Sequence, residues 1–221
     1  RILGYAADFL SKDDDTKAVV GAKVMRKLIE KDGLQEQEVQ KYLAQITDRY
    51  NRKKEDPNST LKAELLSTMV GLSADSSIAK QYARDTFYTY FREALDDNSN
   101  LIRETAIDGL AYVNKASALE ILRTRVAKEP SEEVRAKIID LARDTGGKGD
   151  LDWLAKLIMG TSQESKKAWA AMTKIFSTVE IDILNDWENQ LIPQTSTYNL
   201  SDSQKIEFLQ IVLTKTPAPN K

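Results

Sequence analysis

One helix pattern occurs twice in the middle of this chain. The segment SNLIRETAIDGLAYV (99–113) is followed 32 residues later by SEEVRAKIIDLARDT (131–145). Each segment opens with a polar residue, continues with an aliphatic residue and an arginine, and then shows apolar residues at helical spacing. A chain that repeats a helix pattern at this distance is built from serial units, because each unit must present the same face to its neighbours.

Part of the pattern recurs along most of the chain: a lysine or arginine stands near the start of each of several amphipathic helices. We call this residue the slot base. Successive slot bases are separated by 45, 41, 32, 31 and 39 residues. They are Lys17, Lys62, Arg103, Arg135, Lys166 and Lys205. A repeat of this size holds two helices, and stacked pairs of this kind form α-solenoids. The sequence therefore predicts an all-α fold, a right-handed α-α superhelix of about six helical hairpins.

Helix starts and apolar spacing support this prediction. Trp169, Met172 and Phe176 follow helical spacing, and the sequence lacks sustained apolar/polar alternation. Ser131 has the position of an N-cap. Capping-box spacing marks three further starts: Ser117/Glu120, Thr161/Glu164 and Ser201/Gln204. We expect residues 1–213 to form one solenoid domain, as a segment of a longer protein, and residues 214–221, which contain two prolines, to form a tail or linker.

The composition limits the kinds of catalytic and binding site that the chain can form. The 221 residues include 34 acids and 32 bases, so a broad basic surface for nucleic acid is not expected. The absence of His and Cys removes serine triads, disulfides and the usual zinc ligands. No apolar run approaches the ~20 residues that span a bilayer. We therefore predict no catalytic, cofactor-binding or metal-binding residue, while the compartment stays open.

Three short motifs suggest chemistry but are better explained by structure. The acidic run 13–15 lacks the glycine and distal glutamate of a calcium loop, and it fits a helix cap. The segment DTGGKGD (144–150) lacks phosphate-loop spacing and fits a helix C-cap and hinge. Ser59 and Lys62 match only the first element of a Ser/Lys nucleophile system.

The residues that carry the repeat resemble a known family. The aliphatic-Arg pairs Ile102-Arg103 and Val134-Arg135, each followed by a short turn and a leucine-rich second helix, resemble two HEAT repeats of the short, bilin-lyase-like type. The resemblance is best over 98–160 and weaker on either side. In this HEAT/armadillo class the repeated base pairs with acids at repeat junctions, which implies a structural ladder through Arg103 and Arg135.

The resemblance also implies that second helices line a concave surface. Residues there that face away from the core stripe of Phe87 and Phe91 are candidate partner contacts. The candidates are Gln81, Asp85, Tyr88, Arg92, Glu120, Thr124, Lys128, Trp153 and Lys156, with Lys41, Asp48, Asp182 and Asp186 exposed by the same reasoning. Trp169 and Trp187 lie on apolar stripes and are expected in the core, whereas Trp153 lies off its stripe.

These observations favour an interaction scaffold for a protein or peptide partner, without catalysis of its own. Two alternatives stay open. One is an accessory domain of a larger enzyme. The other is an enzyme on a HEAT-like frame, such as a lyase or a DNA glycosylase; a glycosylase needs a basic concave surface, and the mixed charges of the candidate contacts argue against it.

Overall fold

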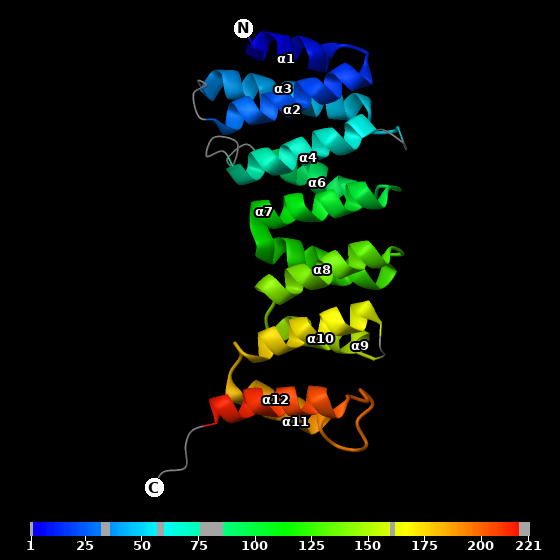
Figure 1. Cartoon of the computed structure of the whole chain (residues 1–221), viewed down its shortest axis with the longest axis vertical. Coiled ribbons are helices and arrows are strands. Elements are labelled where there is room, and N and C mark those ends of the chain that lie inside the picture. Colours follow the sequence, from blue (N-terminus) through cyan, green and yellow to red (C-terminus); the bar gives the residue numbers. More distant parts are fainter. Residues whose placement is uncertain (1, 32–35, 57–59, 76–85, 160–161, 217–221) are drawn as a thin grey trace. The chain divides into compact units, whose positions relative to one another are not determined.

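The computed structural model describes residues 2–31, 36–56, 60–75, 86–159 and 162–216. Within these ranges it contains eleven α-helices, two short 3-10 helices and no strand (Figure 1). The predicted all-α class is confirmed. The chain divides into two compact units, Arg1–Ala118 and Leu119–Lys221, which are described separately.

Unit 1 is built from antiparallel helices in two layers. Its helices are α1 (Ile2–Ser11), α2 (Asp15–Glu30), α3 (Glu36–Arg52), α4 (Thr60–Asp75), α6 (Tyr88–Ala94) and the part of α7 (Asn100–Arg125) that precedes Leu119. Helix α2 packs on α1 and α4, and α3 packs on α4 and α1. Gly21 of α2 permits a close approach to the backbone of α1, because a Cβ there would lie 2.6 Å from the carbonyl oxygen of Ala6.

Helix α7 is two helices joined at one residue. Asn114 has an extended backbone (φ −160°, ψ 100°) inside the span Asn100–Arg125. Its side-chain Oδ1 accepts the backbone N–H of Ser117 at 3.2 Å, so Asn114 caps the second half. The predicted capping box at Ser117 and Glu120 is therefore wrong: both residues lie inside the helix that Asn114 starts.

Unit 2 continues the helix pairs. After the end of α7 come η2 (Val126–Lys128), α8 (Glu132–Thr145), η3 (Lys148–Asp150), α9 (Leu151–Leu157), α10 (Gln163–Phe176), α11 (Ile181–Leu191) and α12 (Asp202–Lys215). Helix α10 packs on α8, α9 and α12, and α11 packs on α12. Ser131 caps α8, and Ser201 with Gln204 forms the predicted capping box of α12. Helix α10 is capped by Ser162, and Thr161 lies outside the described residues.

All six slot bases lie within the first four residues of a helix: α2, α4, α7, α8, α10 and α12. We call these the slot helices and the remaining α-helices, together with the second half of α7, the second helices. Helix α2 packs more closely on α1 than on α3, and α10 more closely on α9 than on α11. In these two cases the slot helix packs most closely on the second helix before it, and not on the one after it as expected for a hairpin that opens with a slot helix.

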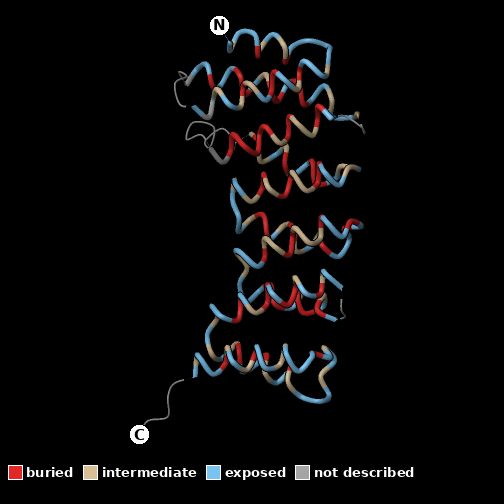
Figure 2. Tube along the Cα trace, in the orientation of Figure 1, coloured by how far each residue is buried: buried red, intermediate tan, exposed pale blue. Residues whose placement is uncertain are grey.

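The core of each unit lies between its two layers (Figure 2). In unit 1 it includes Leu43, Leu65 and Phe91, each fully buried. In unit 2 it centres on Phe176, whose ring packs edge-on against Trp187 and Phe208 with centroids 5.9 and 5.0 Å away. Trp169 and Trp187 are buried at 6% and 5% exposure, as their apolar stripes predicted.

Two slot arginines repeat one local arrangement. Arg103 Nη1 donates to the carbonyl oxygens of Asp97 and Asn98, six and five residues earlier. Arg135 Nη1 donates in the same way to the carbonyls of Glu129 and Pro130. In both cases the guanidinium links the loop that precedes its helix to the first turn of that helix.

The acid of each joint is fixed as well. Asp97 Oδ1 accepts the N–H of Ser99 at 2.8 Å, and Glu129 Oε1 accepts the N–H of Ser131 at 3.0 Å. The segments 97–103 and 129–135 therefore share the pattern acid-x-Ser-x-x-aliphatic-Arg. The serine and the arginine of this pattern were part of the sequence prediction, whereas the acid two residues before the serine was not.

Slot bases also reach into the following repeat. In unit 1, Lys62 Nζ donates to Asp97 Oδ2 at 2.5 Å and to the carbonyl of Lys54 at 2.6 Å. In unit 2, Arg135 holds Glu164 of α10 with two hydrogen bonds, from Nε at 2.8 Å and from Nη2 at 3.3 Å. This hydrogen bonding to the carboxylate raises the pKa of Arg135 further above its usual value.

Candidate interaction surface on the second helices

The second helices of unit 1 carry the first group of predicted contacts. Tyr88 is half-buried at the start of α6, and Arg92 is exposed one turn later. Tyr88 lines an open recess of about 610 Å³ together with Val113, Asn114 and Ser117 from the break in α7. Tyrosine and arginine are among the residue types that are enriched at the anchor positions of protein interfaces. Gln81 and Asp85 lie outside the described residues.

The second helices of unit 2 carry the other group. Glu120 and Thr124 are exposed in the second half of α7, Lys128 in η2, and Lys156 in α9. Asp182 and Asp186 are exposed on α11, as Lys41 and Asp48 are on α3 of unit 1. Apart from Lys128, these residues lie on second helices of their own unit, and they carry both signs of charge. Such mixed charge suits a protein surface better than a phosphate backbone.

Trp153 has a structural role that its sequence position did not reveal. Its ring is half-buried and packs against the core of unit 2, and its Nε1–H donates to Asp150 Oδ1 at 3.0 Å. Asp150 is 3% exposed, accepts the N–H of Gly147 through Oδ2, and lies 3.5 Å from Nε of Arg123. The indole N–H is thus already bonded, so only part of the Trp153 ring is available to a partner.

The segment 144–150 holds a carboxylate rather than an anion site. Gly146 ends α8, its N–H donates to the carbonyl of Ala142 at 2.7 Å, and a Cβ at Gly146 would lie 2.3 Å from that oxygen. The buried carboxylate of Asp150 accepts the free N–H of Gly147 in this loop. A negative side chain at this place disfavours a bound phosphate, which agrees with the C-cap interpretation of these glycines.

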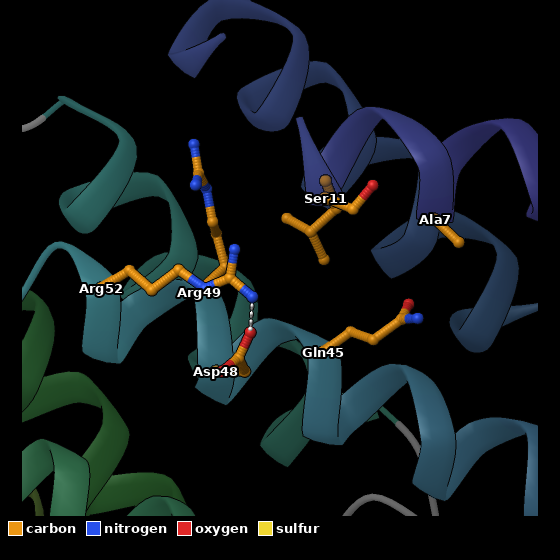
Figure 3. A pocket seen from close by; sticks show the side chains of 7 residues that line it. Ala7, Ser11, Gln45, Asp48, Arg49 and Arg52 are labelled. Carbon is orange, nitrogen blue, oxygen red and sulfur yellow. Dashed lines mark hydrogen bonds and ion pairs between the residues drawn. The ribbon is translucent and has the colours of Figure 1, made fainter. Parts of the chain in front are cut away.

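A pocket that the sequence did not predict lies between α1 and α3 of unit 1. It has a volume of about 200 Å³ and is lined by Ala7, Leu10 and Ser11 of α1 and by Gln45, Asp48, Arg49 and Arg52 of α3. Figure 3 shows the polar side chains of α3 facing Ser11 and Ala7 of α1 across this pocket. One wall is therefore largely apolar and the other polar. Of the lining residues, only Asp48 was a predicted contact.

The polar wall of this α1/α3 pocket contains two unsatisfied atoms. Oε1 of Gln45 and Nε of Arg49 are buried and accept or donate no hydrogen bond among the described residues. Arg49 is 4% exposed, and its other nitrogens approach Asp15 at 3.1 Å and Asp13 at 3.5 Å. Arg52 and Asp48 form an exposed ion pair at 2.6 Å on the rim. Both atoms are buried beneath the surface of the pocket, and a buried acceptor and a buried donor without partners are costly.

Within the described ranges, no group of three or more Asp and Glu side chains is placed to hold a metal ion. None of the described helices is both long and apolar enough to cross a membrane.

Comparison with known proteins agrees with this geometry. The family model for HEAT repeats matches residues 89–173, which contain the segment 98–160 where the sequence resemblance is best. A designed armadillo repeat protein of solved structure is 14% identical, with a TM-score of 0.57, over 98% of this chain and 100% of its own. An engineered protein solved by the Northeast Structural Genomics Consortium is 14% identical, with a TM-score of 0.57, over 97% of this chain and 96% of its own.

None of the curated proteins matches this chain in sequence. At such low identity the structural matches establish the fold alone. Together they show an α-solenoid fold that is similar to that of designed armadillo repeat proteins, and residues 89–173 match the HEAT-repeat model.

Proposed function

We propose that the chain is a protein-interaction scaffold that binds a protein or peptide partner through its second helices and performs no catalysis of its own. Repeat solenoids of this type are typical interaction scaffolds, because side chains on one set of helices can vary without disturbing the shared core. The proposed concave binding surface is formed by the second helices.

The observation that carries this proposal is the recess beside Tyr88. The tyrosine is half-buried, so its ring is already ordered and loses little conformational freedom on binding. The recess is open, and Arg92 is exposed one turn further along α6. Tyrosine and arginine at such a place are the residue types that contribute most of the binding energy in protein interfaces.

The α1/α3 pocket supports the same proposal. Its volume of about 200 Å³ is below the ~300 Å³ at which pockets for drug-sized ligands begin, so it fits one side chain of a partner rather than a cofactor. Its apolar wall on α1 and polar wall on α3 suit a side chain that ends in a polar group.

The test is a double substitution on α6. We expect Tyr88→Ala/Arg92→Ala to reduce the capture of natural binders by the purified chain. For an identified binder, calorimetry should show a binding free energy that is less favourable by about 2 kcal/mol or more. The melting temperature should stay nearly unchanged, because Arg92 is exposed and Tyr88 only half-buried.

A matched control replaces a tyrosine and an arginine on slot helices. Tyr112 of α7 is 58% exposed and Arg143 of α8 is exposed, so Tyr112→Ala/Arg143→Ala removes the same chemistry elsewhere. This control should bind like the unmodified chain. Equal capture by both double variants would show that the α6 surface is not the binding site, and reproducible turnover by the purified chain would overturn the scaffold proposal.

A further inference from the structure

A tryptophan and an arginine on the second helices of unit 2 share one buried carboxylate. Trp153 of α9 donates its indole N–H to Oδ1 of Asp150 at 3.0 Å, and Nε of Arg123, in the second half of α7, lies 3.5 Å from the same oxygen. Oδ2 of Asp150 accepts the N–H of Gly147. Asp150 thus holds both side chains at one site, and we call Arg123 and Trp153 the anchor pair.

The guanidinium of Arg123 presents its outer edge to solvent. Its Nε is buried, whereas 37% of the side chain is exposed. Both Nη groups reach the surface, and they donate no hydrogen bond to any residue in the described part of the chain. Nη1 lies beside Gly149, where a Cβ would be 3.7 Å away. The inner edge of the guanidinium is therefore held by Asp150, while two hydrogen-bond donors on its outer edge stay available.

The charges near the anchor pair are nearly balanced. Two exposed lysines lie on the segments that carry Asp150 and the tryptophan: Lys148 in η3, and Lys156 one turn after the tryptophan on α9. Neither lysine makes a hydrogen bond or an ion pair within the described part of unit 2. The exposed acids Glu120 and Asp152 lie on the same two second helices, so the surface is not a broad basic patch. This balance suits a single carboxylate better than a phosphate backbone.

Resting on the scaffold proposed above, we infer that the anchor pair binds an acidic side chain of the protein or peptide partner. An Asp or Glu carboxylate of the partner accepts hydrogen bonds from the two Nη groups of Arg123. An apolar group next to that acid packs on the exposed part of the half-buried Trp153 ring. A planar guanidinium fits a carboxylate through two parallel hydrogen bonds, and Trp and Arg are enriched at the anchor positions of interfaces.

Asp150 acts in this site as a positioning residue. Its side chain is buried, and both of its oxygens are occupied by groups of the protein itself. Because the anchor pair is already held in the free protein, its two side chains lose little conformational freedom on binding. The negative charge of Asp150 beside Arg123 also keeps the site close to neutral, which admits one carboxylate and disfavours a doubly charged phosphate.

Selection of displayed random peptides on the purified chain tests this inference. We expect the enriched peptides to carry Asp or Glu next to an aliphatic or aromatic residue. Arg123→Lys keeps a cation beside Asp150 but loses the planar fork, so it should weaken a selected peptide by about tenfold. Replacing the peptide's acid by its amide should do the same, and both changes together should cost little more than either alone. Arg143→Lys on α8, where Arg143 pairs with Asp140 and Asp144, is the matched control and should bind normally.

Nuclear magnetic resonance adds a readout that a purely structural role would not change. The indole N–H signal of Trp153 and the Nε–H signal of Arg123 should shift when a selected peptide is added, whereas the indole signals of the two buried tryptophans should not. A selection that enriches no peptide, selected peptides without an acid, or unchanged affinity of Arg123→Lys would overturn the inference. Peptides weakened by Tyr88→Ala/Arg92→Ala but not by Arg123→Lys would overturn it as well, yet they would support the proposed scaffold.

Discussion

Lys62 in unit 1 and Arg135 in unit 2 occupy the same slot but fasten their repeats differently. The Lys62 side chain is 6% exposed and bonds one carboxylate oxygen and one carbonyl. The Arg135 side chain is 25% exposed and bonds both oxygens of Glu164 and two carbonyls. The comparison teaches that an arginine can join two repeats near the surface through its planar fork, whereas a lysine does so as a buried point charge.

The largest effect is expected at the buried lysine. Lys62→Ala removes the cation that pairs with the largely buried Asp97 carboxylate and leaves that carboxylate with the hydrogen bond from the N–H of Ser99. Because a largely buried charge then lacks its partner, the free energy of unfolding should fall by about 3–5 kcal/mol. Denaturant unfolding, with hydrogen exchange of α4 and the first half of α7, measures it. Lys62→Met/Asp97→Asn is the control: removing both charges should recover most of the loss. A loss below about 1 kcal/mol for Lys62→Ala would break the comparison.

An intermediate effect is expected at Arg135. Arg135→Lys keeps the charge but can reach only part of the four hydrogen bonds, so we expect a loss of about 1–2 kcal/mol. Hydrogen exchange of α8 and α10 should report it, while α2 and α4 stay unchanged. If Arg135→Lys were neutral, the fork geometry would not matter at this slot, and the two units would differ only in burial.

The smallest effect concerns pH and the helix caps. Asp14 caps α2 in unit 1, and the backbone N–H of Lys17 lowers the pKa of its carboxyl. The stability it contributes is present above the unfolded pKa of about 3.9 and is lost as pH falls through the lower folded pKa. Ser131, which caps α8 in unit 2, has no such titration.

Protection factors of amides in α2 and α8, measured against pH, test this difference. We expect acidification through the carboxyl range to weaken protection in the first turn of α2. Asp14→Asn keeps a cap acceptor and should flatten that dependence. Equal acid sensitivity of the α2 start in both proteins would show that the Asp14 cap is not the cause of the pH dependence there.

The fold could be predicted from the sequence because its signals are local. Helical spacing and the slot bases depend on residues a few positions apart, and the caps at Ser131 and Ser201 followed from the same range. Ser117 shows the limit of such signals. Its spacing to Glu120 fits a capping box, yet one extended residue, Asn114, starts the helix earlier.

The candidate surface was harder to predict because it depends on which helices pack together. The α1/α3 pocket requires residues about 40 positions apart, such as Ala7 and Gln45, to face each other. Apolar spacing shows that each helix has a buried face but not which neighbour covers it. For the same reason, apolar spacing does not reveal that α2 packs more closely on α1 than on α3.

Asp97 has a consequence for how such a chain changes its length during evolution. Its carboxylate receives Lys62 from the repeat before it, and its carbonyl receives Arg103 from the helix after it. A duplication or deletion with its end between Asp97 and Arg103 would keep Lys62 with its carboxylate but separate Arg103 from the carbonyl of Asp97 that it bonds. Viable insertions should therefore carry the acid and its arginine as one inherited block, with their ends placed before residue 97 rather than at the visible start of the helix.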